Sequence, residues 1–143
     1  RKETNMAGCI YNFTFADFIK SSVAKEAGIN NMPVDPAVIQ NWFDLVTMCL
    51  QPARVVLGKP MVESSGYRCK ALNAHPKIRG KSNSQHLTGQ ALDFTVPGMR
   101  PAEVVAKLKA SNIEYDQLIN EYDRWVHLSF NKGKNRKQCF KIS

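Results

Sequence analysis

The chain has 143 residues, with 20 Lys and Arg against 12 Asp and Glu, which gives a formal net charge of +8. This length suits one domain of roughly 100–200 residues, and a hydrophobic content of 43% excludes an intrinsically disordered chain. No uncharged apolar run approaches the roughly 18 residues of a membrane-spanning helix. The polar opening Arg-Lys-Glu-Thr-Asn also lacks the hydrophobic segment of a signal peptide.

The first half of the chain predicts helices. Thr14 fits a helix N-cap, apolar residues follow it at helical spacing, and Gly28 is a suitable end. An Asp-Pro pair at 35–36 opens a second helix, whose apolar residues from Val38 to Leu50 recur every three or four positions. We expect Pro52 to kink or break this helix, because proline lacks the backbone N–H that a helix interior needs.

The second half predicts a sheet with one helix. Strands are expected at residues 60–64 and 91–96, and a helix at 101–110. Two β-rich runs, 116–121 and 125–130, are separated by about three polar residues, which indicates a hairpin. Helices followed by antiparallel strands are typical of the α+β class.

The chain shows no internal repeat or linker, so we expect one domain over residues 1–143, with a core at about 11–130 and a basic C-terminal tail at 131–143. The tail is either a solvated segment or a patch for an anionic partner, such as nucleic acid or a cell-wall polymer. Its basic residues are Lys132, Lys134, Arg136, Lys137 and Lys141.

Four cysteines are scattered along the chain without a CxxC pair: Cys9, Cys49, Cys69 and Cys139. This spacing favours free thiols over disulfides or a cysteine-ligated metal. Cys49 is expected to be buried in its helix.

Two polar residues lie in strands that otherwise read as buried. Asp93 follows Ala-Leu and precedes Phe-Thr-Val, and His127 lies between Val126 and Leu128. A buried carboxylate is costly unless it is paired or bound to a cation. Together with His86, just before the Asp93 strand, they could supply two imidazoles and one carboxylate, the open ligand set of catalytic zinc. The alternative is that each histidine is a hydrogen-bonded core residue; His75, in a loop, is expected at the surface.

Three motifs surround these residues: Ser64-Ser65-Gly66-Tyr67-Arg68, Ser84-Gln85-His86, and Trp125-Val126-His127. The first half adds Asn31-Met32-Pro33, Leu50-Gln51-Pro52-Ala53-Arg54 and Gly58-Lys59-Pro60. With these motifs and the His-x6-Asp…His pattern, the chain resembles the zinc D-Ala-D-Ala carboxypeptidase family of metallopeptidases and its phage lysin relatives over about residues 11–130. The resemblance implies a hedgehog/DD-peptidase-like fold, with N-terminal helices packed on a small antiparallel sheet.

Carried over to this chain, the resemblance implies that His86, Asp93 and His127 bind one Zn²⁺ ion. Arg68 matches the arginine that anchors a substrate carboxylate, a role that suits the paired donors of a guanidinium; the alternative is a structural salt bridge. Ser84 and Gln85 are expected to shape the metal loop and the substrate site, with Ser84 bonding an Asp93 oxygen.

The general base is less defined by the sequence. Many relatives carry an acidic residue three places before the last histidine ligand, and this chain has Arg124 there. If residues 122–124 form a three-residue loop, Glu121 pairs with Trp125 and shares the face of the sheet that carries His127. Glu121 is therefore the first candidate and Asp123 the second. The remaining candidates are Asp116, Glu114 or no protein base.

The resemblance implies hydrolysis of amide bonds in peptidoglycan stem peptides, as a D,D-carboxypeptidase or an endopeptidase, or as an endolysin of a phage. The alternative is a non-catalytic zinc-containing module that binds the cell wall or belongs to a virion, which the missing acid at position 124 favours. We expect a monomer with no specific nucleic-acid partner. It would act at a bacterial cell wall, as an extracytoplasmic protein or as a phage product.

Overall fold

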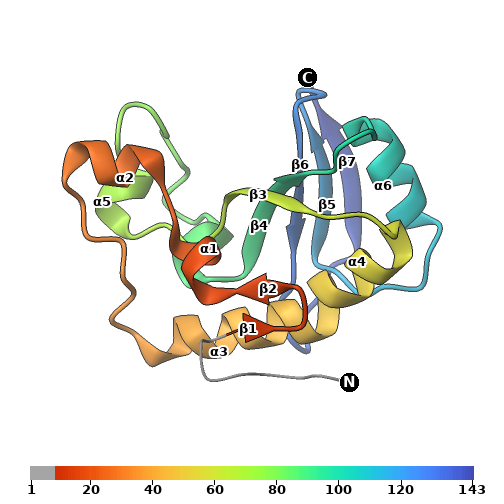
Figure 1. The fold of residues 1–143 in the computed structure, drawn as a ribbon, viewed down its shortest axis with the longest axis horizontal. Helices are drawn as coiled ribbons and strands as arrows, with labels where there is room; N and C mark the ends of the chain where they lie inside the picture. Colours follow the sequence, from red (N-terminus) through yellow and green to blue (C-terminus); the bar gives the residue numbers. More distant parts are fainter. Residues whose placement is uncertain (1–8) are drawn as a thin grey trace.

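In the computed structural model, which describes residues 9–143, the first half of the chain is mainly helical and the second half mainly strand (Figure 1). The predicted α+β class is confirmed. The described part begins with a small hairpin, β1 (Cys9–Ile10) and β2 (Phe13–Thr14). The helices are α1 (Phe15–Ile19), α2 (Ser22–Ala27), α3 (Pro36–Leu45), the π-helical turn η1 (Val46–Leu50), α4 (Gln51–Leu57), α5 (Lys70–Asn73), the 3₁₀ helix η2 (Gln85–Thr88) and α6 (Pro101–Lys109).

Within the described residues the main sheet has five strands, in the order β3-β4-β6-β5-β7. Its strands are β3 (Val62–Ser65), β4 (Ala91–Thr95), β5 (Gln117–Glu121), β6 (Trp125–Ser129) and β7 (Gln138–Ile142). The first four strands pair antiparallel, as predicted, whereas β7 pairs parallel to β5. The sheet is therefore mixed, and the prediction of a purely antiparallel sheet was wrong for this edge.

Strand β7 lies in the segment that we treated as a basic tail. Cys139 and Phe140 pair with Leu118 and Ile119 of β5. Apolar residues between the lysines therefore allow this segment to form the edge strand of the sheet. In the sequence, the many lysine and arginine residues of this segment led to its interpretation as a tail, and the short apolar pattern was not recognised as a strand.

The first predicted helix is divided in two. Thr14 caps α1 as expected, because its hydroxyl accepts a hydrogen bond from the Asp17 backbone N–H (3.1 Å). The chain is then extended at Lys20, and the Ser21 hydroxyl caps α2 through the Ala24 N–H. Two serine and threonine caps thus compete with a continuous helix. Gly28 ends α2 in the left-handed conformation, at φ 69°.

Pro52 does not end the second helix, because the helical path continues past it to Leu57, but a π-helical turn interrupts the regular α-helix just before the proline. Asp35 caps α3, and the helical path then runs through η1 into α4. In η1 the Gln51 N–H reaches back to the Val46 carbonyl, one residue further than in an α-helix. This wider turn just before Pro52 accommodates a residue that has no N–H and crowds the preceding turn.

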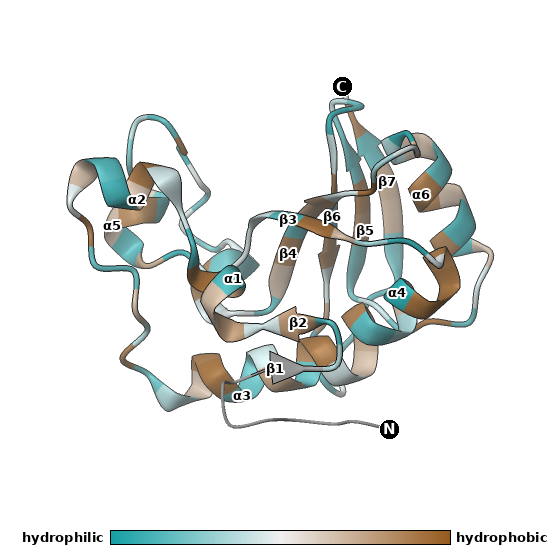
Figure 2. Cartoon of the chain, viewed as in Figure 1, coloured by the Kyte–Doolittle hydropathy of each residue, from teal (hydrophilic) through white to brown (hydrophobic). Residues whose placement is uncertain are grey.

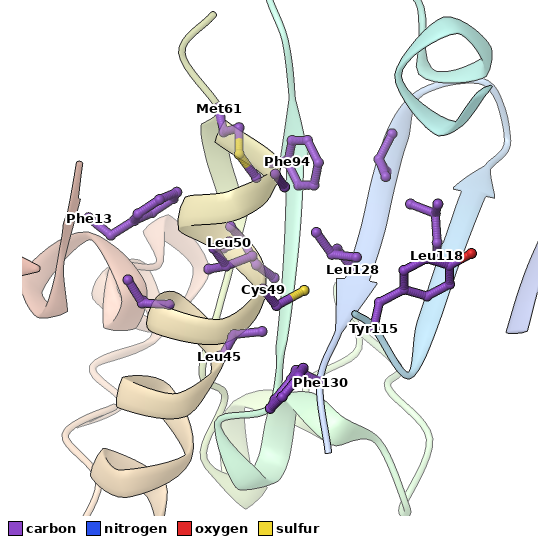
Figure 3. Packing of buried hydrophobic residues seen from close by; sticks show 14 of the residues in the cluster. Phe13, Leu45, Cys49, Leu50, Met61, Phe94, Tyr115, Leu118, Leu128 and Phe130 are labelled. Carbon is purple, nitrogen blue, oxygen red and sulfur yellow. The ribbon is translucent and has the colours of Figure 1, made fainter. Parts of the chain in front are cut away.

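The long helix made by α3, η1 and α4 packs against one face of the sheet. Figure 3 shows Leu45, Cys49 and Leu50 directed towards the sheet residues Phe94 and Leu128. Helix α6 covers the same side, and its residues Val104 and Leu108 are buried in the core. Both apolar and polar residues occur along its length (Figure 2).

Because side chains alternate along a strand, the other face of the sheet has a different composition. Leu92 and Phe94 of β4 belong to the core, so Asp93 between them points to the face that lacks these helices. The β5–β6 hairpin has the predicted three-residue loop, and Glu121 pairs with Trp125. Tyr122 and Asp123 are both left-handed, at φ 59° and 55°, as in turns that match the strand twist. Within residues 9–143, none of the helices has the length and apolarity to cross a membrane.

Cys49 gives a test of the core. It is 0% exposed, and burial raises the pKa of its thiol. We expect iodoacetamide at about pH 8 to leave Cys49 of the native protein unmodified, because only a thiolate reacts and an exposed thiol has a pKa of about 8.5. Half-buried Cys69 is the internal comparison, and peptide mass spectrometry distinguishes the two sites. Native labelling of Cys49 at the rate of Cys69 would contradict this packing.

Candidate metal and catalytic site

Asp93 and His127 face each other across two neighbouring strands. They are direct partners in the β4–β6 register, on the face of the sheet opposite the long helix. His127 Nδ1 lies 3.0 Å from Asp93 Oδ1, and both residues are buried. The two polar residues that interrupt the apolar strands therefore form one contact.

The third residue, His86, is held beside this pair by η2. Its Nε2 lies 3.3 Å from Asp93 Oδ2, and its ring meets that of His127 edge to face at 5.3 Å between centroids. One nitrogen of each imidazole and one carboxylate oxygen all lie within 4.8 Å of one another. Three residues from η2, β4 and β6 are thus close enough to share one ion.

The donor chemistry fits a zinc ion. His86 Nδ1 lies 2.6 Å from the Gly66 carbonyl, so its N–H donates there and the Nε2 lone pair points to Asp93. Although burial opposes ionisation of Asp93, His86 and His127 hold the pKa of its carboxyl well below the usual range. Two neutral imidazoles and one carboxylate form the three-ligand set of catalytic zinc sites, which keep a fourth position open.

Gly66 has a steric role that the sequence motif alone does not explain. A Cβ at this position would lie 2.3 Å from the Phe18 carbonyl oxygen and 2.5 Å from the Phe18 ring. The Tyr67 N–H also donates to that Phe18 carbonyl (2.9 Å). The close approach of α1 therefore requires glycine at the residue whose carbonyl orients His86.

Arg68 lies next to the metal group with a fixed guanidinium. Its Nε donates to Asn73 Oδ1 (3.1 Å), its Nη1 to Ser65 Oγ (3.1 Å) and its Nη2 to Ser84 Oγ (3.5 Å). Burial lowers the pKa of Arg68, which the charges of Asp93 and Glu121 partly offset. These three partners are neutral, so within residues 9–143 Arg68 does not form the structural salt bridge that we considered from the sequence.

Asn73 is a residue that sequence reasoning missed. It is buried, it accepts from Arg68, and its Nδ2 donates to the Lys81 carbonyl (2.9 Å). A Cβ on Gly80 would overlap the Asn73 amide, so this loop closes tightly over it. The only sequence signal is an asparagine five residues after Arg68.

Ser84 is placed differently from the prediction. Its hydroxyl caps η2 by accepting from the His86 N–H (3.1 Å) and contacts Arg68, and it makes no bond to Asp93 within the described residues. The bond expected for Ser84 was wrong in its partner: Ser64 Oγ instead donates to the Asp93 backbone carbonyl (3.2 Å). A serine at the start of a short helix satisfies the nearest free N–H groups.

Gln85 is directed away from the metal group. Its Nε2 donates to Asp116 Oδ2 (2.9 Å), and the carboxylate of Asp116 also binds Arg136. The side chain of Gln85 is thus engaged in a buried network behind the site. Its predicted role in contacting substrate gains no support from this placement.

Glu121 is the acidic residue that the hairpin brings to the metal group. Its Oε2 lies 3.7 Å from His127 Nδ1, and its Oε1 accepts from Trp125 Nε1 (3.1 Å). Burial raises the pKa of Glu121, and the negative charge of Asp93 adds to this effect. Trp125 is half-buried on this face and orients the Glu121 carboxylate.

The other acidic candidates lie elsewhere. Asp123 is exposed in the loop, where Asn120 Nδ2 donates to it (2.9 Å) and Lys141 Nζ lies at 3.1 Å. Asp116 is buried in the network with Arg136, and Glu114 lines a separate hollow near Phe130. His75 lies outside the metal group, in the loop after α5.

Comparison with known families agrees with this geometry. The family model described as Peptidase M15 matches residues 11–129, a range that contains the three metal-site residues, Arg68 and Glu121 but ends before β7. A search of the curated proteins found no match.

The metal group leads to a direct prediction. Asp93→Ala removes the carboxylate that lies between two imidazoles, so we expect the variant to lose zinc that the wild type retains after dialysis. Metal analysis by mass spectrometry measures the zinc content per chain. Asp123→Ala is the matched control, because it removes an exposed carboxylate and should leave the zinc content unchanged. Full zinc content in folded Asp93→Ala would refute the assignment.

Proposed function

The chain belongs to peptidase family M15, the family of the zinc D-Ala-D-Ala carboxypeptidases, and from this premise we propose that it hydrolyses amide bonds in peptidoglycan stem peptides. M15 peptidases are zinc-dependent metallopeptidases. We propose one zinc ion, held by His86, Asp93 and His127. The observation that carries the proposal is the buried His-Asp-His group with a carboxylate, Glu121, beside it.

When bound, zinc would polarise the scissile carbonyl and lower the pKa of a water molecule from its very high value in bulk water to about 7. Glu121 is placed to accept a proton from the attacking water through Oε2, while Trp125 holds Oε1. The protonated Glu121 then donates to the nitrogen of the leaving amine, so that one residue acts as base and then as acid. Its raised pKa is consistent with carrying that proton.

Arg68 is proposed to bind a substrate carboxylate. Asn73, Ser65 and Ser84 engage one donor on each of its three nitrogens. Since a guanidinium has five N–H donors, one on each Nη is left for the two oxygens of a carboxylate. This role suits a D,D-carboxypeptidase, whose substrate ends in a free carboxylate, or an endopeptidase that cleaves near the D-Glu carboxylate.

The proposed place of action is a bacterial cell wall, reached by an extracytoplasmic or a phage-encoded protein. The net charge of +8 supports attraction to an anionic wall. The direct test is digestion of purified peptidoglycan by the zinc-loaded protein, with released fragments identified by mass. If the zinc-loaded wild type releases none and cleaves no stem peptide, the second candidate applies: a non-catalytic wall-binding or virion-associated module, which Arg124 at the usual acid position favours.

Replacement of the proposed base should separate chemistry from metal binding. Glu121→Gln keeps the shape and the hydrogen-bond acceptor for Trp125 but cannot take a proton, so we expect a rate about 10²–10⁴-fold lower with zinc content unchanged. Asp123→Asn, two residues away and exposed, should retain the wild-type rate. A wild-type rate for Glu121→Gln would refute the role, and a large loss for Asp123→Asn would transfer it there.

Arg68 can be tested through the substrate. A hydrogen bond to a charged group contributes about 1.5–3 kcal/mol, so Arg68→Ala should reduce kcat/KM for a stem peptide by roughly 10–100-fold. Amidation of the contacted carboxylate should reduce the wild-type value similarly and have little further effect on the variant. Additive losses from the two changes would show that Arg68 does not contact that group.

A further inference from the structure

Asp116, just before β5, is a carboxylate with 0% exposure and an unusually complete set of partners. Its Oδ1 accepts from the Arg136 backbone N–H (2.7 Å) and from Arg136 Nε (3.0 Å). Its Oδ2 accepts from Arg136 Nη2 (2.7 Å) and from Gln85 Nε2 (2.9 Å). The hydrogen bonds from Arg136 hold the pKa of Asp116 below its usual range.

The two partners of Asp116 come from different parts of the chain. Gln85 immediately precedes the metal ligand His86 and is the first residue of η2. Arg136 lies in the C-terminal segment, beyond residues 11–129 that match the family. A single buried carboxylate therefore connects the turn that carries His86 to a part of the chain outside the family match.

A second contact ties the same turn to the same segment. The Gln90 N–H donates to the Gln85 carbonyl (3.0 Å), and the Phe130 N–H donates to the Gln90 carbonyl (3.0 Å). Gln90 Nε2 also donates to Asn131 Oδ1 (3.2 Å). The turn from 85 to 90 is thus connected to the chain that follows β6 directly at Gln90 and through Asp116 at Gln85.

We infer that Asp116 and Arg136 are positioning residues for the metal ligand His86, acting through Gln85. The inference rests on the proposed zinc site. The carboxylate of Asp116 can only accept a hydrogen bond, so the Nε2 end of the Gln85 amide must face it. This contact fixes the rotation of that amide. Gln85 Oε1 is then buried without a partner among the described residues, which shows that the Asp116 contact, and not solvent, sets the position of this side chain.

Arg136 makes this arrangement possible. A buried carboxylate is strongly unfavourable without a paired charge, and removal of one partner leaves the other uncompensated. Without the Arg136 guanidinium, Asp116 would therefore be solvated by water or would change its conformation. Gln85 would then lose its fixed partner, and the turn that presents His86 Nε2 would become less rigid. Mutation of a group that is hydrogen-bonded directly to a metal ligand typically lowers metal affinity by about 10–100-fold. Arg136 acts through Asp116 and Gln85, so its effect should lie at the lower end of that range.

The experiment measures zinc affinity by competition with a chelator, together with the melting temperature, and does not depend on peptidase activity. We expect Arg136→Ala to weaken zinc binding by roughly tenfold, the lower end of that range. Lys134→Ala is the matched control, because it removes a nearby exposed lysine that has no side-chain partner within the described residues, and should bind zinc as the wild type does. If Arg136→Ala does not fold, Arg136→Lys tests the same contact, since it keeps the charge but not the two-nitrogen grip.

Further variants distinguish positioning of His86 by Arg136 from a general contribution of Arg136 to stability. Val104→Ala removes buried volume in α6; it should lower the melting temperature without changing zinc affinity below it. Gln85→Ala should weaken zinc binding, and Gln85→Ala with Arg136→Ala should weaken it no more than the larger single effect, because both act through Asp116. Unchanged zinc affinity in Arg136→Ala, an equal loss in Val104→Ala, or multiplying effects in the double variant would overturn the inference. Absence of peptidoglycan cleavage would bear on the proposed function alone.

Discussion

The contact between Asp93 and the two histidines is the constraint on which the rest of this structure depends. A carboxylate in the middle of an apolar strand is unfavourable unless positive charge or a cation offsets its burial. His127 meets it from the next strand and His86 from a separate turn, so the sheet register and the loop before β4 must both be correct. The strong lowering of the Asp93 pKa reflects the same balance, because the imidazoles outweigh the effect of burial.

The N-terminal helices support this contact at a distance. The long helix fills one face of the sheet with apolar side chains and leaves the other face for polar ones (Figures 1 and 3). Helix α1 packs so closely on the end of β3 that only glycine fits at position 66, and the Gly66 carbonyl sets which nitrogen of His86 is free. The orientation of a metal ligand thus depends on a backbone contact made by Phe18, far from it in the sequence.

The features that follow from local periodicity could be predicted from the sequence. Polar residues inside the β4 and β6 patterns identified Asp93 and His127, and a three-residue hairpin loop placed Glu121 on their face. The parallel strand β7, the network of Asp116 and the contacts of Asn73 could not be predicted in this way. Each depends on hydrogen bonds between groups that are distant in the sequence. A single asparagine or aspartate shows no periodic pattern from which its partner could be predicted.

The hairpin also explains how the site can keep a carboxylate despite Arg124. In this chain position 124 is the exposed end of a loop whose first two residues are left-handed, and its N–H closes the turn onto the Glu121 carbonyl (3.0 Å). Strand positions point reproducibly to one face, whereas loop positions depend on the turn. Glu121 is the cross-strand partner of Trp125, two residues before His127, so it lies diagonally across from that ligand. A carboxylate on the neighbouring strand therefore reaches the metal group by sheet geometry, independently of the residue at position 124.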